Sequence, residues 1–252
     1  MSTWVFLRGL TREQRHWGTF PALFGQQLPG AQVVTLDLPG NGGLHAQSSP
    51  PTVEAMAEHC RAALRERGLA PPYHVLAMSL GAMVTVAWAS AHPQELAGAV
   101  LINTSLRPFS AFHQRLRPRH YGTILRLIIR GAAAEEWERT VLRLTTRQAD
   151  EPERLIQDWV RFRDDAPVSR ANALRQLWAA ARFKATAQVP QVPMLILASA
   201  QDGLVNPACS RALARHWGCN LVAHPSAGHD LPLDDGEWVA RQVCRKFGGA
   251  PP

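Results

Sequence analysis

Short apolar runs alternate with longer helical patterns along most of the chain, and this alternation restricts the fold more than any other feature. Six runs are rich in aliphatic and β-branched residues: 3–9 (TWVFLRG), 32–38 (QVVTLDL), 73–78 (YHVLAM), 97–104 (AGAVLINT), 193–199 (PMLILAS) and 220–225 (NLVAHP). Helical periodicity follows most of them, for example over 13–28 and 52–68. Near-continuous apolar strands alternating with helices predict a parallel sheet with both faces covered. We therefore expect an α/β protein with a mostly parallel six-stranded sheet and helices on both faces.

The alternation stops between residues 104 and 190. Residues 106–186 carry several helical patterns and no strand pattern. In open α/β sheets, ligands bind beyond the carboxyl ends of the strands. An all-helical insertion at this point therefore predicts a cap over that edge. We expect a core formed by residues 1–104 and 190–252, and a helical cap formed by residues 105–189.

The composition is that of a folded protein, with 46% hydrophobic and 19% charged residues among 252. No apolar run reaches the roughly 18 residues that span a membrane. The first ten residues, MSTWVFLRGL, lack the pattern of a signal peptide. We therefore expect a cytoplasmic protein, and take a monomer as the default. The four cysteines show neither paired nor metal-finger spacing, so we expect reduced thiols and no metal site.

The net charge of +7 is concentrated in the predicted cap. Between Ser105 and Thr186 there are 15 Arg and one Lys against nine acidic residues. A basic segment can attract an anionic ligand or an acidic protein. Arginine supplies 25 of the 27 basic residues, so a bias in genomic base composition is an equally simple explanation. Because no nucleic-acid motif accompanies the charge, we expect no nucleic-acid partner.

One serine lies where a predicted strand meets a predicted helix. In VLAMSLGAMV (residues 75–84), Ser79 has Ala77 two positions before it and Gly81 two positions after it. Small flanking residues permit the sharp strand–turn–helix junction that exposes a nucleophilic serine, usually written G-x-S-x-G. A serine that opens a helix is also a common N-cap. This stretch alone leaves both interpretations open.

Two later residues supply the groups that a serine nucleophile requires. Asp202 follows the run at 193–199, and His229 follows the run at 220–225. Since the carboxyl ends of parallel strands share one edge of a sheet, we expect all three side chains at that edge. The order serine, acid, histidine is that of an α/β-hydrolase triad. We therefore predict a catalytic triad of Ser79, Asp202 and His229, and expect Asp230 to be a solvent-exposed or helix-capping group.

Acyl transfer by such a triad also needs two backbone N–H groups that face the developing negative charge. Leu80 directly follows the serine and is the first candidate. The second is expected from the loop LRGLTREQRHW, in which Leu10 is best placed. Arg8, in the same loop, either supports the loop or binds a substrate carboxylate or phosphate. Met78 either lines the substrate pocket or packs in the core.

Motifs distributed along the whole chain resemble the α/β-hydrolase superfamily. They are FLRGL…HW, VTLDLPGNGG, AMSLGA, AHPQELAGAVLINTS, QDGLV and SAGHD. Within the superfamily, LDLPGNG, MSLGAMV and QDGLVNP are most similar to small cap-bearing serine esterases such as the pimeloyl-acyl-carrier-protein methyl ester esterases. The cap carries no likeness that identifies a substrate. Two departures are Arg8-Gly9 in place of the usual His-Gly, and Ala77 in place of the first glycine of the serine motif.

The resemblance implies an α/β-hydrolase fold and two-step hydrolysis of a carboxylic ester or thioester, without metal or organic cofactor. The expected substrate is a small-molecule ester, either free or linked to an acyl carrier protein. Two alternatives remain open. The same triad performs C–C bond hydrolysis or lyase chemistry in related enzymes, and a hydrolase scaffold can also bind ligands without turnover. The sequence identifies neither the acyl part nor the alcohol part of the substrate.

Overall fold

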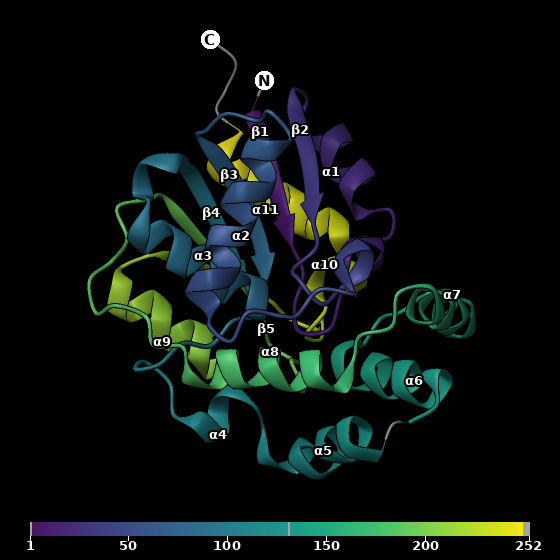
Figure 1. The fold of residues 1–252 in the computed structure, drawn as a ribbon. Coiled ribbons are helices and arrows are strands. Elements are labelled where there is room, and N and C mark those ends of the chain that lie inside the picture. The colour runs from purple at the N-terminus through teal and green to yellow at the C-terminus, as the bar shows by residue number, and fades with distance from the viewer. Residues whose placement is uncertain (1, 131, 249–252) are drawn as a thin grey trace.

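A sheet of six parallel strands forms the centre of the protein, with strand order β2-β1-β3-β4-β5-β6. The computed structural model describes residues 2–130 and 132–248 (Figure 1). Residues 1 and 249–252 of the predicted core and residue 131 of the predicted cap lie outside the described residues. The strands are β1 (Ser2–Leu7), β2 (Ala31–Leu36), β3 (Tyr73–Met78), β4 (Leu96–Ile102), β5 (Met194–Ser199) and β6 (Asn220–His224).

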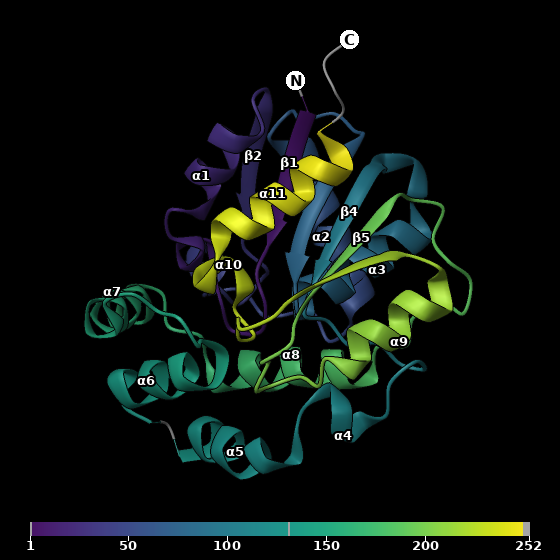
Figure 2. The same ribbon diagram turned by 180° about the vertical axis from the view of Figure 1, so that it is seen from behind.

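Side chains alternate along each central strand between two hydrophobic layers. In β1, Val5 and Leu7 face one layer, whereas Trp4 and Phe6 face the other. The first layer is covered by α2 (Val53–Glu66), α3 (Leu80–Ala91) and α9 (Ala208–Trp217). The second is covered by α1 (Phe20–Gln27) and α11 (Gly236–Phe247), which lie together on the other side of the sheet (Figure 2). The predicted α/β class, parallel sheet and two-sided helical cover are confirmed.

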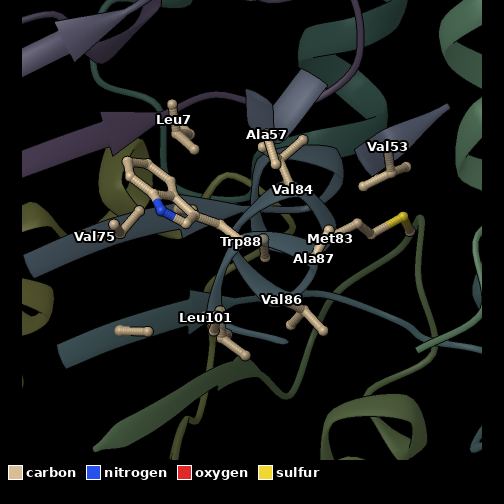
Figure 3. Close-up of a cluster of buried hydrophobic side chains, with 14 of the residues drawn as sticks. Leu7, Val53, Ala57, Val75, Met83, Val84, Val86, Ala87, Trp88 and Leu101 are labelled. Atoms are coloured by element: carbon tan, nitrogen blue, oxygen red, sulfur yellow. The ribbon is translucent and has the colours of Figure 1, made fainter. Parts of the chain in front are cut away.

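The helix α3 is central to the first layer. Ten of its twelve residues are buried, and Trp88 is fully enclosed (Figure 3). The side chains of α3 share this cluster with Leu7, Val75 and Leu101, which come from three adjacent strands. A helix that is apolar on nearly all sides is stable only when it is buried. This packing holds the first residues of α3 in a fixed position at the carboxyl ends of β1 and β3.

Two local predictions need correction. The helical pattern expected over 13–28 is divided into a 3-10 turn and α1, because Gly18 between them has a φ of +53°. The second strand ends at Leu36, before Asp37. The carboxylate of Asp37 instead accepts hydrogen bonds from the backbone N–H groups of Gln14 and Gly43, at 2.7 and 3.0 Å. These bonds draw the chain away from the sheet edge.

Between β4 and β5, the described residues form helices and connecting loops but no strand, apart from one β-bridge that joins Arg107 to Lys184. The helices are α4 (Phe112–Arg115), α5 (Tyr121–Arg130), α6 (Ala134–Thr145), α7 (Pro152–Asp165) and α8 (Arg170–Arg182). Both views show them beyond the carboxyl ends of the strands, at the end of the molecule opposite the termini (Figures 1 and 2). We call α4–α8 the helical segment; the boundaries 105 and 189 of the cap stay a prediction.

The remaining elements are short. They are the helix α10 (Leu231–Asp234) and the 3-10 turns η1 (Gln14–Trp17), η2 (Gly42–Leu44), η3 (Pro93–Glu95) and η4 (Pro118–His120). None of the helices in the described ranges is long and apolar enough to cross a membrane.

Candidate active site

Ser79 occupies a strained turn between β3 and α3. Its φ is +52° and its ψ is −115°, a conformation that residues with a side chain rarely adopt. Gly81 explains how the turn can be so tight. A Cβ atom at this position would lie 2.6 Å from the carbonyl oxygens of both Leu7 and Arg8. Only glycine lets α3 begin this close to β1, so Ser79 is held at the sheet edge.

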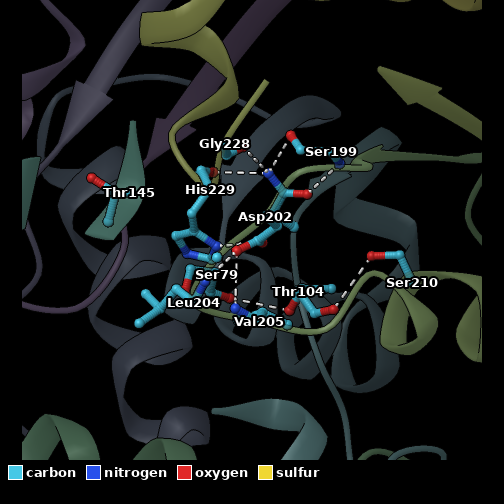
Figure 4. Close-up of polar contacts among 12 residues, drawn as sticks. Ser79, Thr104, Thr145, Ser199, Asp202, Leu204, Val205, Ser210, Gly228 and His229 are labelled. Carbon is cyan, nitrogen blue, oxygen red and sulfur yellow. Dashed lines mark hydrogen bonds and ion pairs between the residues drawn. The ribbon is translucent and has the colours of Figure 1, made fainter. Parts of the chain in front are cut away.

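His229 and Asp202 form a buried hydrogen-bonded pair at the same edge. His229 Nδ1 lies 2.7 Å from Asp202 Oδ2, and both side chains are almost fully enclosed (Figure 4). The other carboxylate oxygen of Asp202 accepts hydrogen bonds from the backbone N–H groups of Leu204 and Val205, at 2.8 and 2.9 Å. Every oxygen of the carboxylate therefore has a partner, and its orientation toward the imidazole is fixed.

The electrostatic surroundings favour the protonated form of His229. Burial alone lowers the pKa of this imidazole, but the charge and hydrogen bond of Asp202, together with the charge of Asp230, outweigh that effect. The pKa of His229 is consequently raised above its ordinary value. A histidine that gains a proton readily and shares it with a fixed carboxylate suits a general base.

Two residues that the sequence did not single out hold the histidine loop. Asn103, directly after β4 and with a φ of +46°, donates from Nδ2 to the carbonyl oxygen of His229 at 2.8 Å. It also accepts a hydrogen bond from the backbone N–H of Ser199 at 2.8 Å. Asp234 accepts a hydrogen bond from the backbone N–H of Gly228 at 2.6 Å. The available signal was weak: an Asn directly after a strand, and an Asp near the start of the last helical pattern.

The predicted oxyanion donors lie beside the serine. Leu80 is the first residue of α3, where a backbone N–H has no intrahelical acceptor. Leu10 lies in the loop after β1, and no described backbone carbonyl accepts a hydrogen bond from its N–H. Both residues line one cavity together with Ser79. Their role as donors stays a prediction.

Arg8 is buried and already paired. Its guanidinium binds both carboxylate oxygens of Asp230, at 3.1 and 2.5 Å, and lies 4.7 Å from the ring centre of Trp17. The expectation that Asp230 is solvent-exposed is therefore wrong, because its side chain is the buried counter-ion of Arg8. Asp230 does hold the N-cap position of α10, but its side chain makes no capping hydrogen bond there. Since a paired guanidinium has little charge to offer a ligand, this geometry supports the loop-supporting alternative for Arg8.

Two apolar cavities meet at Ser79, and they share Leu10, Ile124 and Leu204. The narrow cavity, of about 110 Å³, also contacts His229, Trp137 and Val141. The wide cavity, of about 300 Å³, also contacts Leu80, Met83, Phe112 and Leu177. Met78 lines the narrow cavity and is at the same time packed among core side chains, so it fits both of its expected roles.

Within residues 2–130 and 132–248, no group of three His, Cys, Asp or Glu side chains is arranged to hold a metal ion. Besides Ser79 and His229, the narrow cavity is lined by the polar residues Arg8, Thr11, Arg12, Thr145 and Asp230.

Comparisons with known proteins agree with this architecture. The Alpha/beta hydrolase family matches residues 4–242. No curated protein matches the sequence. A thermophilic esterase from Thermogutta terrifontis superimposes with a TM-score of 0.74 at 21% identity, over 97% of this chain and 89% of that one. The enol-lactonase from Burkholderia xenovorans LB400 gives 0.78 at 20% identity, over 98% and 92% of the two chains. A hydrolase from Oleispira antarctica gives 0.78 at 16% identity, over 99% and 92%.

At these identities the solved structures establish a shared fold. The family match, in contrast, extends over nearly the whole chain, including the strained serine turn and the buried acid–histidine pair. On that basis, the chain belongs to the α/β hydrolase family.

Proposed function

We propose that the protein is a serine hydrolase that cleaves carboxylic esters through Ser79, His229 and Asp202. The observation that carries the proposal is the buried His229–Asp202 hydrogen bond beside a serine on a positive-φ turn. Because Nδ1 of His229 is bonded to Asp202, Nε2 is the nitrogen left to take a proton from Ser79. His229 and Ser79 line the same narrow cavity, which brings base and nucleophile to one substrate.

The reaction has two steps. Ser79 Oγ attacks the ester carbonyl while His229 removes its proton, and the resulting oxyanion accepts hydrogen bonds from the N–H groups of Leu10 and Leu80. The imidazolium then protonates the leaving alcohol, which departs and leaves an acyl-serine. Water, deprotonated by His229, releases the acid and restores the enzyme. Asp202 stabilises the imidazolium in both steps.

The two cavities suggest which part of the substrate goes where. The leaving alcohol must be within reach of His229, and the narrow cavity is the one that His229 lines. The wide cavity contacts Leu80 and not His229, and nearly all of its lining is apolar. We therefore assign the alcohol to the narrow cavity and an apolar acyl chain to the wide one. The helical segment acts as the cap that walls both.

Several finer predictions of the sequence stay predictions. They are the likeness to pimeloyl-acyl-carrier-protein methyl ester esterases, an acyl carrier as part of the substrate, a thioester substrate, a monomeric state and a cytoplasmic location. C–C bond hydrolysis and ligand binding without turnover remain as alternatives to ester hydrolysis, and no contact in the site favours either of them.

Covalent labelling with a fluorophosphonate tests the proposal. We expect one adduct on the wild-type protein, none on Ser79→Ala and slow labelling of His229→Ala, as measured by intact mass. Ser105→Ala is a matched control, because Ser105 is also buried and lines the wide cavity but belongs to no triad. An adduct on Ser79→Ala would contradict the assignment of Ser79 as the nucleophile. A folded wild-type protein that forms no adduct would contradict it as well.

A further inference from the structure

The charges of the helical segment are divided sharply between its parts. All nine acidic residues between 105 and 186 lie within 135–165, which contains α7 and all of α6 except its first residue. Residues 105–134 and 166–186 contain ten basic residues and no acidic residue. These two stretches form α4, α5 and α8. A bias toward arginine across the whole protein does not explain why, within the helical segment, acidic residues occur in α6 and α7 but not in α4, α5 and α8.

The same three helices carry the exposed hydrophobic side chains. Among the described residues, the large hydrophobic side chains with high exposure are Phe112, Leu125, Ile129, Leu174 and Trp178, at 46% to 70%. Soluble surfaces seldom gather such residues without a binding role. Arg126, Arg175 and Arg182 are exposed on the same helices, and the guanidinium of Arg182 lies 5.1 Å from the ring centre of Trp178.

Four of these exposed side chains, two on α5 and two on α8, lie next to the residues through which the two helices contact each other. Ile124 and Ile128 of α5 pack in one cluster with Ala173 and Leu177 of α8. Leu125 and Ile129 directly follow the first pair, and Leu174 and Trp178 directly follow the second. The helix α5 is therefore apolar on its inner side and again on part of its outer side. A helix between a cavity and water should have a polar outer side, so this one is suited to a cover that is itself apolar.

The wide cavity opens among these helices. The residues of the helical segment that line it all come from α4, α5 and α8 or the turn between α4 and α5. Phe112 lines the cavity and is also 70% exposed, which places it at the rim. A hydrophobic molecule leaving an apolar environment at this surface would enter the cavity without crossing bulk water.

We propose that α4, α5 and α8 form a docking face for an anionic lipid surface. Arginines beside exposed aliphatic and aromatic side chains match the two attractions of such a surface, which are negative headgroups and an accessible acyl layer. An acidic protein would satisfy the arginines but leave the exposed hydrophobic pairs of α5 and α8 in water. The proposal concerns where the protein sits, and it does not depend on the reaction assigned to Ser79.

Vesicle sedimentation of the full-length Ser79→Ala protein tests the face without any hydrolysis. We expect binding to vesicles of phosphatidylcholine mixed with phosphatidylglycerol, weak binding to phosphatidylcholine alone, and release by salt. Leu125→Gln with Ile129→Gln, and separately Leu174→Gln with Trp178→Gln, should each weaken binding, because one face requires both helices. Arg126→Gln with Arg175→Gln should weaken it by roughly tenfold or more.

The controls use residues of the acidic part and activity in solution. Arg154→Gln with Arg161→Gln removes two exposed arginines from α7 and should leave vesicle binding unchanged. When the same glutamine substitutions are made in the protein that keeps Ser79, the variants should hydrolyse a water-soluble acetate ester normally. The reason is that the substituted residues line neither cavity. This activity also shows that they fold.

Three results would overturn the proposal. The first is no binding to anionic vesicles by the folded protein. The second is binding that the α7 variants weaken as much as the α5 and α8 variants. The third is a protein complex that the glutamine variants disrupt although the protein does not bind vesicles. Such a complex, either a dimer or a complex with an acidic acyl carrier protein, would assign the face to a protein partner instead.

Discussion

Gln176 of α8 accepts a hydrogen bond through Oε1 from the backbone N–H of Thr11, at 2.8 Å, and so joins the helical segment to the loop after β1. The amide group of Gln176 also donates to Asn41 Oδ1 and Ser49 Oγ, at 2.8 and 3.0 Å, and the side chain is completely buried. Thr11 has a φ of +57° and directly follows Leu10. The helical segment thus fixes the backbone beside a proposed oxyanion donor.

Gln176→Leu should therefore lower kcat more than it changes KM. Without its acceptor, the N–H of Thr11 no longer restrains the neighbouring peptide, and a small misplacement of the Leu10 N–H weakens transition-state binding. We expect kcat to fall about 10- to 100-fold. This decrease is at most as large as the one caused by removing an oxyanion donor. Steady-state kinetics with a soluble ester measure the effect, and Gln176→Glu, which keeps the acceptor oxygen, should recover part of it.

The matched control for this positioning role is Asn172→Ala. Asn172 lies one turn earlier on α8 and also joins it to the core, through the Ser49 N–H at 2.9 Å and the Gln47 carbonyl at 2.9 Å. None of its side-chain hydrogen bonds reaches the loop after β1. If both substitutions lower kcat equally, Gln176 acts only by holding the helical segment in place, and the positioning role is wrong.

The pH dependence of kcat/KM should report the charges around His229. The neutral imidazole is the base, so activity falls as the pH drops through the pKa of His229, which lies above the ordinary value for histidine. Asp230→Asn removes a charge that raises this pKa and should move the acidic limb to lower pH. Arg8→Gln removes a charge that lowers it and should move the limb to higher pH.

The opposite signs make this pair of variants decisive. Both break the same buried ion pair, so both should lose stability, by about 3–5 kcal/mol in thermal or urea unfolding. A shift of the acidic limb in the same direction in both variants would mean that structural damage, and not electrostatics, controls the profile.

The features that the sequence predicted well depend on local patterns. The continuous burial of β1 from Trp4 to Leu7, and the position of Ser79, Asp202 and His229 each after a strand, follow from rules that act over a few residues. The carboxyl edge of a parallel sheet then brings the three loops together whatever the intervening sequence. The turn of Ser79 was predictable in the same way, since Gly81 allows the close approach to Leu7.

Long-range partners were beyond reach. Arg8 and Asp230 are 222 positions apart, and Thr11 and Gln176 are 165 apart. Each residue alone suits a surface position as well as a buried one. Arg8 and Asp230 meet because the loops after β1 and β6 converge, and Thr11 and Gln176 meet because α8 packs on the core; a single sequence records neither contact. The cavities were unpredictable for the same reason, because their walls come from both parts of the chain.

Gly81→Ala should destabilise the protein by about 1–3 kcal/mol, as in other overpacked sites. The added methyl group would meet the carbonyl oxygens of Leu7 and Arg8 at 2.6 Å, and a backbone cannot move aside as a flexible side chain does. Gly25→Ala in α1 is the control, because a Cβ there meets nothing within 4 Å and should stabilise the helix by about 0.5–1 kcal/mol. Urea unfolding compares the two, and equal effects would contradict the tight approach of α3 to β1.

The assignment of acyl chain and alcohol to separate cavities predicts a crossed pattern of specificity. Leu177→Trp adds bulk to the wide cavity, so it should lower kcat/KM for an octanoate ester at least tenfold while sparing the acetate ester of the same alcohol. Val141→Trp adds bulk to the narrow cavity and should act on the alcohol series instead, sparing methyl octanoate relative to hexyl octanoate. The reverse pattern would exchange the two assignments while leaving the triad intact. Equal losses across both series would show that the cavities do not divide the substrate at Ser79.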